Sequence, residues 1–157
     1  MIEKIFNSRK LNYSSNLNEE NLKQKIEDLF NQSDLGFVGK FRNQNEFKVY
    51  DQWTYITWYI PNFKRKTAYI NGQIIKSGNG TLLKLNIKPN PVIAILPIFT
   101  VLIGIISIMM AESNIKTLIF GLIIIAIGVL FYLLGMFLTH RIQSNFKKYF
   151  ELKMVKI

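Results

Sequence analysis

The fold is decided by two stretches of sequence, PNPVIAILPIFTVLIGIISIMMA (residues 89–111) and TLIFGLIIIAIGVLFYLLGMFLT (residues 117–139). Each has 23 residues and contains no Asp, Glu, Lys, Arg or His. As a helix, each spans roughly 34 Å at about 1.5 Å per residue, more than the ~30 Å hydrocarbon layer of a bilayer. Only residues 112–116 separate the two stretches, so the chain must turn back at once. We therefore predict a transmembrane helical hairpin over residues 89–139.

Two buried helices of a soluble protein are the other interpretation of these stretches. Helices that are apolar on every side need a large amount of surrounding protein, and a chain of 157 residues cannot supply it. We therefore expect an integral membrane protein. The rest of the sequence divides into a soluble domain over residues 1–88 and a basic amphipathic tail helix over residues 140–157.

Lysine and arginine gather on the outer flanks of the two predicted spans. They are Lys76, Lys84 and Lys88 before the first span, and Arg141, Lys147, Lys148, Lys153 and Lys156 after the second. The connecting residues hold only Lys116, which Glu112 offsets. Because cytoplasmic flanks carry the excess of Lys and Arg, both termini are predicted to be cytoplasmic. The abundance of Asn, Ile and Lys indicates an AT-rich bacterial genome, so the expected location is the bacterial inner (cytoplasmic) membrane, crossed more than once.

The net charge of +10 bears on the partners of the chain. Anionic lipid of the cytoplasmic leaflet lies next to these cations, and each cation near the surface contributes on the order of 1 kcal/mol of attraction. We therefore expect the lipid bilayer and its anionic headgroups as partners, and regard nucleic acid as a poor candidate. The residues expected to contact headgroups are Lys64, Arg65, Lys66, Arg141, Lys147 and Lys148.

The soluble domain begins with one amphipathic helix and continues with strands. Leu22, Ile26 and Leu29 recur at helical spacing over residues 18–31, with Asn18 as the expected N-cap. Beyond the helix the apolar period changes to two, which predicts strands over residues 37–41, 46–50, 53–60, 67–75 and 81–87. Residues 10–14 alternate weakly and are an expected edge strand. The sequence thus predicts an α+β fold, a small antiparallel sheet with one helix packed on a face.

The predicted strand over residues 53–60 is apolar on both faces. Two interpretations stay open for it. Either it is a central strand buried on both sides, or its aromatic side chains meet a partner or the membrane interface, where Trp and Tyr are favoured. The candidate partner surface consists of Trp53, Tyr55, Trp58 and Tyr59.

The two spans carry small residues at regular spacing. Gly121, Gly128 and Gly135 recur every seven residues and share one face of the second helix. Gly104 and Ser107 belong to a similar stripe in the first helix. Small residues let helix backbones approach closely in lipid, so these five are the expected helix-packing residues. The stripes either face each other within the hairpin or mediate self-association into a homo-oligomer.

The tail after the second span is also two-sided. Phe146, Tyr149 and Phe150 share a face opposite Lys147 and Lys148. Such a segment lies on the bilayer surface, or it supplies a cover for the sheet. The sequence favours neither placement.

Catalytic chemistry has little material in this chain. It has no cysteine, and the only histidine is His140, directly after the second span. Cysteine-based metal sites are excluded, and catalytic triads have no suitable histidine. We therefore expect no enzymatic activity, no metal and no cofactor, and an interfacial position for His140.

A resemblance rests on the pattern Phe37-x-Gly39, Phe47, Gly72-x-Ile74 and Gly80-Thr81-x-Leu83-x-Leu85 leading into the predicted hairpin. The chain resembles a group of small uncharacterised bacterial membrane proteins with a cytoplasmic α+β domain followed by a transmembrane hairpin. The resemblance implies a shared architecture and supplies no activity and no site residues.

The function that we expect from the sequence is therefore a non-enzymatic one. The chain would present a cytoplasmic recognition or scaffold domain at the inner membrane and bind a protein partner or lipid headgroups. The alternative is an oligomerising membrane effector, pore-forming or membrane-disrupting, of a defence or toxin system. A lipid-modifying enzyme is a third hypothesis.

Overall fold

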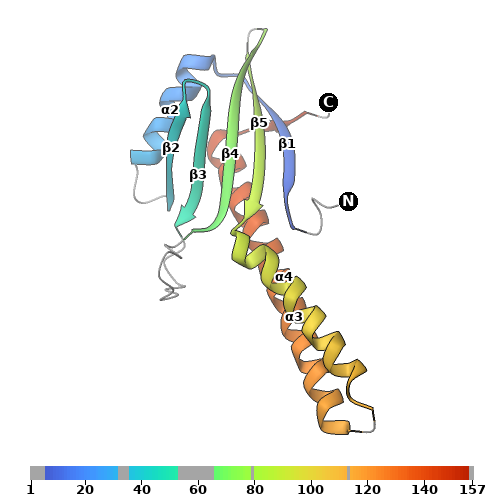
Figure 1. Ribbon diagram of the computed structural model, residues 1–157. Helices are drawn as coiled ribbons and strands as arrows, with labels where there is room; N and C mark the ends of the chain where they lie inside the picture. Colours follow the sequence, from blue (N-terminus) through green and yellow to red (C-terminus); the bar gives the residue numbers. More distant parts are fainter. Residues whose placement is uncertain (1–5, 32–35, 53–65, 79, 113, 156–157) are drawn as a thin grey trace.

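The computed structural model describes residues 6–31, 36–52, 66–78, 80–112 and 114–155. Over these residues the chain is an α+β structure with a six-stranded antiparallel sheet and three helices, so the predicted class is confirmed (Figure 1). The elements in chain order are β1 (Arg9–Ser15), α2 (Glu19–Asn31), β2 (Phe37–Asn43), β3 (Glu46–Gln52), β4 (Lys66–Ser77), β5 (Gly80–Pro89), α3 (Pro91–Met109), α4 (Ile115–Phe150) and β6 (Lys153–Met154).

The strands lie in the order β2-β3-β4-β5-β1-β6. Consecutive strands β2 to β5 form an antiparallel meander, and Ser77 pairs with Gly80 at the turn between β4 and β5. Gly78 adopts a φ of 58° in that turn, a conformation that glycine reaches without strain. The strand expected at an edge over residues 10–14 is instead β1, which lies between β5 and the two-residue β6. That prediction was wrong because the chain after α4 returns alongside β1.

Helix α2 forms where the sequence predicts it. The Asn18 side chain accepts a hydrogen bond from the Asn21 backbone N–H at 2.8 Å, which caps the first turn. Lys23 donates to Glu19 at 2.7 Å, and this bond lowers the pKa of the Glu19 carboxyl. The buried stripe of the helix consists of Leu22, Ile26 and Leu29, and it packs on the sheet.

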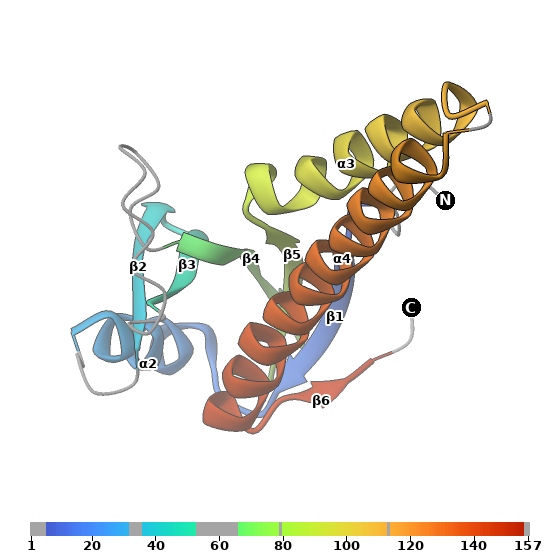
Figure 2. The ribbon, with the colours of Figure 1, turned by 90° about the horizontal axis from the view of Figure 1, so that it is seen from below.

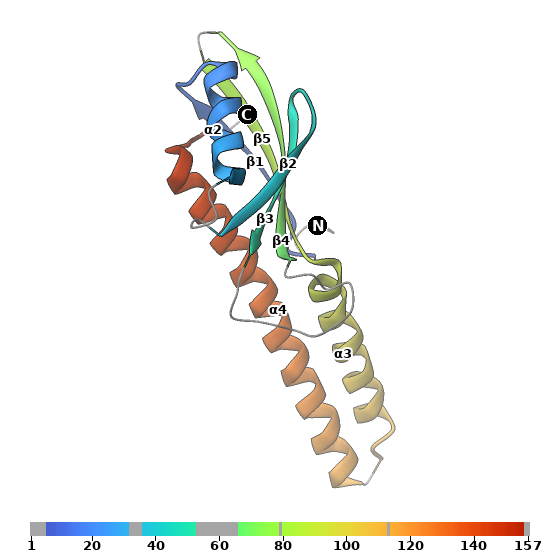
Figure 3. The same ribbon diagram turned by 90° about the vertical axis from the view of Figure 1, so that its left-hand side faces the viewer.

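The C-terminal half of α4 covers the same face of the sheet as α2 (Figure 3). Ile142, Phe146 and Phe150 belong to the buried core together with residues of α2 and of the inner strands. The Phe146 ring stacks on Phe47 of β3 at a centroid distance of 6.0 Å. Of the two placements open for the tail, the structure therefore has the one that covers the sheet.

Helix α4 is one uninterrupted helix of 36 residues. At about 1.5 Å per residue it is roughly 54 Å long, which lets it follow α3 over its first half and cross the sheet with its second (Figure 2). It ends at Phe150, where Glu151 takes a left-handed conformation, so the helix expected over residues 140–157 is shorter than predicted. Lys153 and Met154 then pair with β1 as β6.

In the middle of the sheet, an aromatic ring of β3 lies directly against the backbone of β4. Phe47 of β3 and Gly72 of β4 are direct cross-strand partners. The Phe47 ring occupies the space that a Cβ atom on Gly72 would need. Phe47 is thereby buried against Phe146, and the strands can carry an aromatic core without being pushed apart.

We predict that Phe146→Ala destabilises the sheet domain by about 3–5 kcal/mol, because it removes a ring that is 1% exposed and leaves a cavity between α4 and β3. The matched control is Asn145→Ala, an exposed neighbour on the same helix. Urea unfolding of the full chain in mild detergent, followed by near-ultraviolet circular dichroism, measures both. Equal unfolding free energies for the two variants would contradict the packing described here.

Candidate functional site

The connection between β5 and α3 sets the direction of the first apolar helix. Asn90 is the N-cap, and its side chain accepts a hydrogen bond from the Val92 N–H at 3.0 Å. The Asn90 N–H donates to the Thr67 carbonyl of β4 at 2.8 Å. Pro91 fills the first helical position, where no N–H is needed. The helix therefore starts directly from the end of the sheet, with no flexible linker between them.

Helices α3 and α4 lie antiparallel and pack through small residues. A Cβ atom on Gly104 would lie 2.8 Å from the Gly121 carbonyl oxygen, and one on Gly121 would lie 2.8 Å from the Gly104 carbonyl oxygen. A Cβ atom on Gly128 would meet Thr100 Oγ1 at 2.6 Å, and one on Gly135 would meet Ile93 Cγ2 at 3.2 Å. The seam between the helices is thus formed by all four glycines that the sequence analysis named.

Serine and threonine on α3 keep their hydroxyl groups satisfied within the helix. Ser107, the fifth expected packing residue, is half-buried and donates to the Ile103 carbonyl at 2.9 Å. Thr100 donates to the Leu96 carbonyl at 3.0 Å. The hydroxyl groups at these two positions of α3 are therefore satisfied, as an apolar surrounding requires.

Large apolar side chains cover the outside of the helix pair. In α3, only 11% of the apolar 18-residue stretch is buried inside the structure. In α4, the buried share of the corresponding stretch is 17%. The most exposed side chains are Phe99, Ile106, Met109, Met110, Ile115, Phe120, Leu130 and Phe137. Both helices are long and apolar enough to cross a membrane. Helix α3 and the first half of α4 extend away from the sheet (Figure 1), and the second half of α4 packs on it.

The other residues expected to contact lipid or a partner are placed as follows. Lys147 and Lys148 are exposed on the outer side of α4, His140 is exposed, and Arg141 is half-buried. Lys66 is the first residue of β4. Lys64, Arg65 and the aromatic set Trp53, Tyr55, Trp58 and Tyr59 lie outside the described residues.

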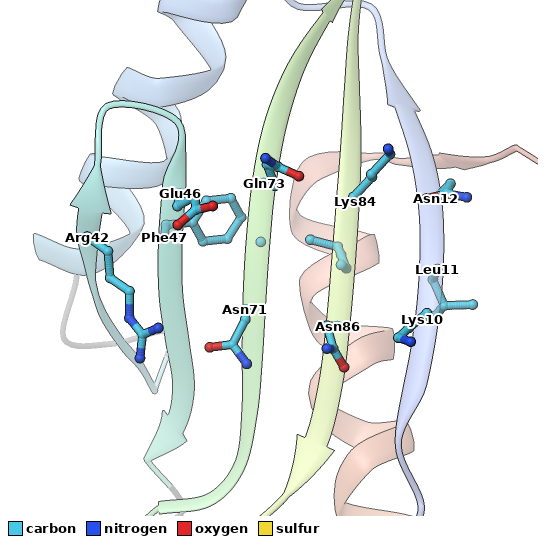
Figure 4. A pocket seen from close by; sticks show the side chains of 12 residues that line it. Lys10, Leu11, Asn12, Arg42, Glu46, Phe47, Asn71, Gln73, Lys84 and Asn86 are labelled. Atoms are coloured by element: carbon cyan, nitrogen blue, oxygen red, sulfur yellow. The ribbon is translucent and has the colours of Figure 1, made fainter. Parts of the chain in front are cut away.

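The sheet face opposite α2 and α4 is polar and strongly basic, which the sequence analysis did not predict. It holds a shallow groove of about 490 Å³ (Figure 4). Its polar lining residues are Lys10, Asn12, Arg42, Glu46, Asn71, Gln73, Lys84 and Asn86. Three cations and four amides face a single carboxylate, so the groove is suited to an anionic or hydroxyl-rich ligand.

Two tyrosines lie beside this groove. Tyr50 and Tyr69 are direct cross-strand partners, and Lys48 Nζ lies 4.5 Å from the centroid of the Tyr69 ring. Burial raises the pKa of the Tyr69 hydroxyl. The phenol is therefore neutral at physiological pH and available as a hydrogen-bond donor.

A second groove lies where the open face meets the start of α3. It also has a volume of about 490 Å³ and shares Lys10 and Asn86 with the first. Its other lining residues are Phe6, Ser8, Lys88, Pro89, Pro91, Ala94 and Ile95. We call it the junction groove. Two lysines, one amide and one serine form its polar wall, and apolar side chains form the other.

The described residues contain no group of three or more His, Asp or Glu side chains that could hold a metal ion. Comparisons with protein-family models, with curated proteins and with solved structures found no match.

We predict that Gly128→Leu weakens the association of α3 and α4, because a side chain there meets Thr100 and Val101 within 3 Å. Overpacking of this kind destabilises by about 1–3 kcal/mol. Unfolding in mixed micelles of increasing dodecyl sulfate content, followed by far-ultraviolet circular dichroism, measures the loss. Val129→Leu, on the exposed side of the same turn, is the control, and a loss of the same size there would refute the seam.

Proposed function

We propose that the chain is an integral protein of the bacterial inner membrane, with both termini in the cytoplasm, that presents a non-enzymatic recognition domain at the membrane surface. The observation that carries the proposal is the outer surface of α3 and α4. Phe99, Leu130 and their exposed apolar neighbours have no protein around them in the described structure, while the glycines lie inside the pair. Burial of such a surface in lipid removes it from water.

The charges at the two ends of the helix pair support the cytoplasmic placement. Lys88 precedes α3, and Arg141 and Lys147 follow the apolar part of α4. The far end has Lys116 together with Glu112. Cations concentrated at the sheet end are the arrangement expected of a cytoplasmic flank.

The open face of the sheet supports a role in recognition. Helices α2 and α4 cover one face, and among the described residues the other presents the amides Asn71 and Asn86 with several lysines. Exposed polar side chains on a rigid sheet are positioned for binding without rearrangement. Catalysis would require convergent acid, base or nucleophilic groups, and the groove offers the single carboxylate of Glu46.

The effector hypothesis draws less support from the same contacts. Self-association through the glycine stripes would need Gly121 and Gly128 on an outer surface. They instead contact Ile108 and Thr100 of the same chain. An oligomer would have to open the pair or use the large apolar residues outside it.

Membrane insertion and orientation can be tested with single cysteines, because the chain has none of its own. We predict that Glu112→Cys, at the turn between α3 and α4, reacts with a membrane-impermeant maleimide in intact spheroplasts. Ser77→Cys, at the exposed tip of the β4–β5 turn, should react only after the cells are opened. Both variants should stay in the pellet after carbonate extraction.

Two results would overturn the proposal. Extraction of the chain into the carbonate supernatant would remove the membrane assignment. Reaction of Ser77→Cys in intact spheroplasts, with Glu112→Cys protected, would reverse the orientation.

A further inference from the structure

We propose that the junction groove binds the phosphate headgroup of an anionic membrane lipid and holds the start of the lipid's acyl chains against α3. This inference rests on the proposed membrane location. It names a ligand class for a site that differs from the basic residues singled out in the sequence.

The groove is assembled by three segments that are far apart in sequence. Ser8 and Lys10 come from the N-terminal segment and β1, Asn86 and Lys88 from β5, and Ile95 from α3. In Figure 3, α3 and α4 leave the sheet from its two opposite sides, with α3 on the open side. The groove therefore lies where the polar face of the domain meets the first turns of an apolar helix.

That position corresponds to the headgroup layer of the bilayer in the proposed orientation. Lys88 is three residues before α3, and Ile95 is in its second turn. With a rise of about 1.5 Å per residue, the groove spans the first few ångströms of the predicted span. A lipid molecule can occupy it without leaving the membrane.

The polar wall of the groove is suited to a phosphate group. Lys10 and Lys88 are exposed cations, and no Asp or Glu is among the lining residues. Ser8 Oγ lies 3.4 Å from Asn86 Oδ1 as a hydrogen-bond donor. Asn86 thus adds a polar side chain to the same lining as the two cations.

The apolar wall continues into the outer surface of the helix pair. Phe6 and Ile95 are 37% and 42% exposed. Ile95 is followed along the same side of α3 by Phe99 and Leu102, which are 59% and 50% exposed. These three side chains are spaced four and three residues apart, so they form a continuous apolar strip on one side of α3. Acyl chains attached to a phosphate in the groove would lie along that strip.

The adjoining sheet groove gives the headgroup room to extend. The two grooves share Lys10 and Asn86. Asn71 lies directly across from Asn86 on β4, and Asn12 lies further up the open face (Figure 4). A hydroxyl-bearing headgroup such as glycerol on the phosphate would meet these amides, whereas a choline cation would meet lysines. The charge pattern therefore favours phosphatidylglycerol over phosphatidylcholine.

The experiment titrates the full chain in detergent with dioctanoyl phosphatidylglycerol and counts bound lipid by native mass spectrometry. We expect saturable binding of one lipid, and about fivefold weaker binding for Lys88→Gln, because one cation near the headgroup is lost. Lys76→Gln, which removes an exposed cation at the other end of the sheet, should bind like the wild type. Ala94→Phe fills the groove and should abolish the site, while Ala126→Phe on the exposed side of α4 should not.

The same titration includes phosphatidylcholine of equal chain length and glycerol 3-phosphate, which lacks the chains. Binding of glycerol 3-phosphate as tight as that of the lipid would overturn the lipid assignment in favour of a soluble phosphate ligand. Equal binding of phosphatidylcholine, or unchanged binding by both Lys88→Gln and Ala94→Phe, would overturn the site. These results leave cysteine accessibility and carbonate extraction untouched, so failure of the lipid site is distinguishable from failure of the membrane location.

Discussion

Helix α4 is the element on which the rest of the structure depends, because one uninterrupted helix packs against α3 and also against the sheet. Its first half packs through Gly121 and Gly128 against α3. Its second half packs through Phe146 and Phe150 into the core of the sheet domain. Because α4 is a continuous helix of 36 residues, the face that packs on α3 has a fixed angle about the helix axis relative to the face that packs on the sheet. The apolar pair and the domain are thereby joined through packing as well as through the short β5–α3 connection.

The parts of the fold that the sequence predicts are those with a strong local period. The stripe of Leu22, Ile26 and Leu29 and the alternation along β4 and β5 specify helix and strand directly. The place of β1 could not be predicted, because it depends on pairing with β5, about 70 residues further along the chain. The end of α4 was misplaced for a related reason. Nothing in the local sequence shows that Lys153 and Met154 are more stable paired with β1 than as a continuation of the helix.

The candidate site shows the same division. The four glycines of the seam could be named from the sequence because their spacing follows the helix period. The junction groove could not, since Lys10, Asn86 and Ala94 carry no common motif and only the sheet register brings them together. Alternation along β5 does place Lys84, Asn86 and Lys88 on one face of the strand. The buried Leu85 and Ile87 lie on the opposite face. That signal indicates an open polar face, and the register with β1 adds the position of Lys10 on it.

The way the two helices leave the sheet has a consequence for how the domain stands on a membrane. Helix α4 joins the covered face and α3 the open face, so the sheet is held between them at its foot (Figure 3). A single tether would let the domain rotate about its linker. Here Asn90 anchors α3 to β4, and Phe146 anchors α4 to β3. In the proposed orientation the open face therefore stands at a fixed angle to the bilayer, with Lys88 at its base and the amides of Asn71 and Gln73 above it. The proposed lipid site between α3 and β5 would lie where both anchors fix the geometry. For this reason we place selective lipid recognition at the junction and not at the exposed lysines of α4.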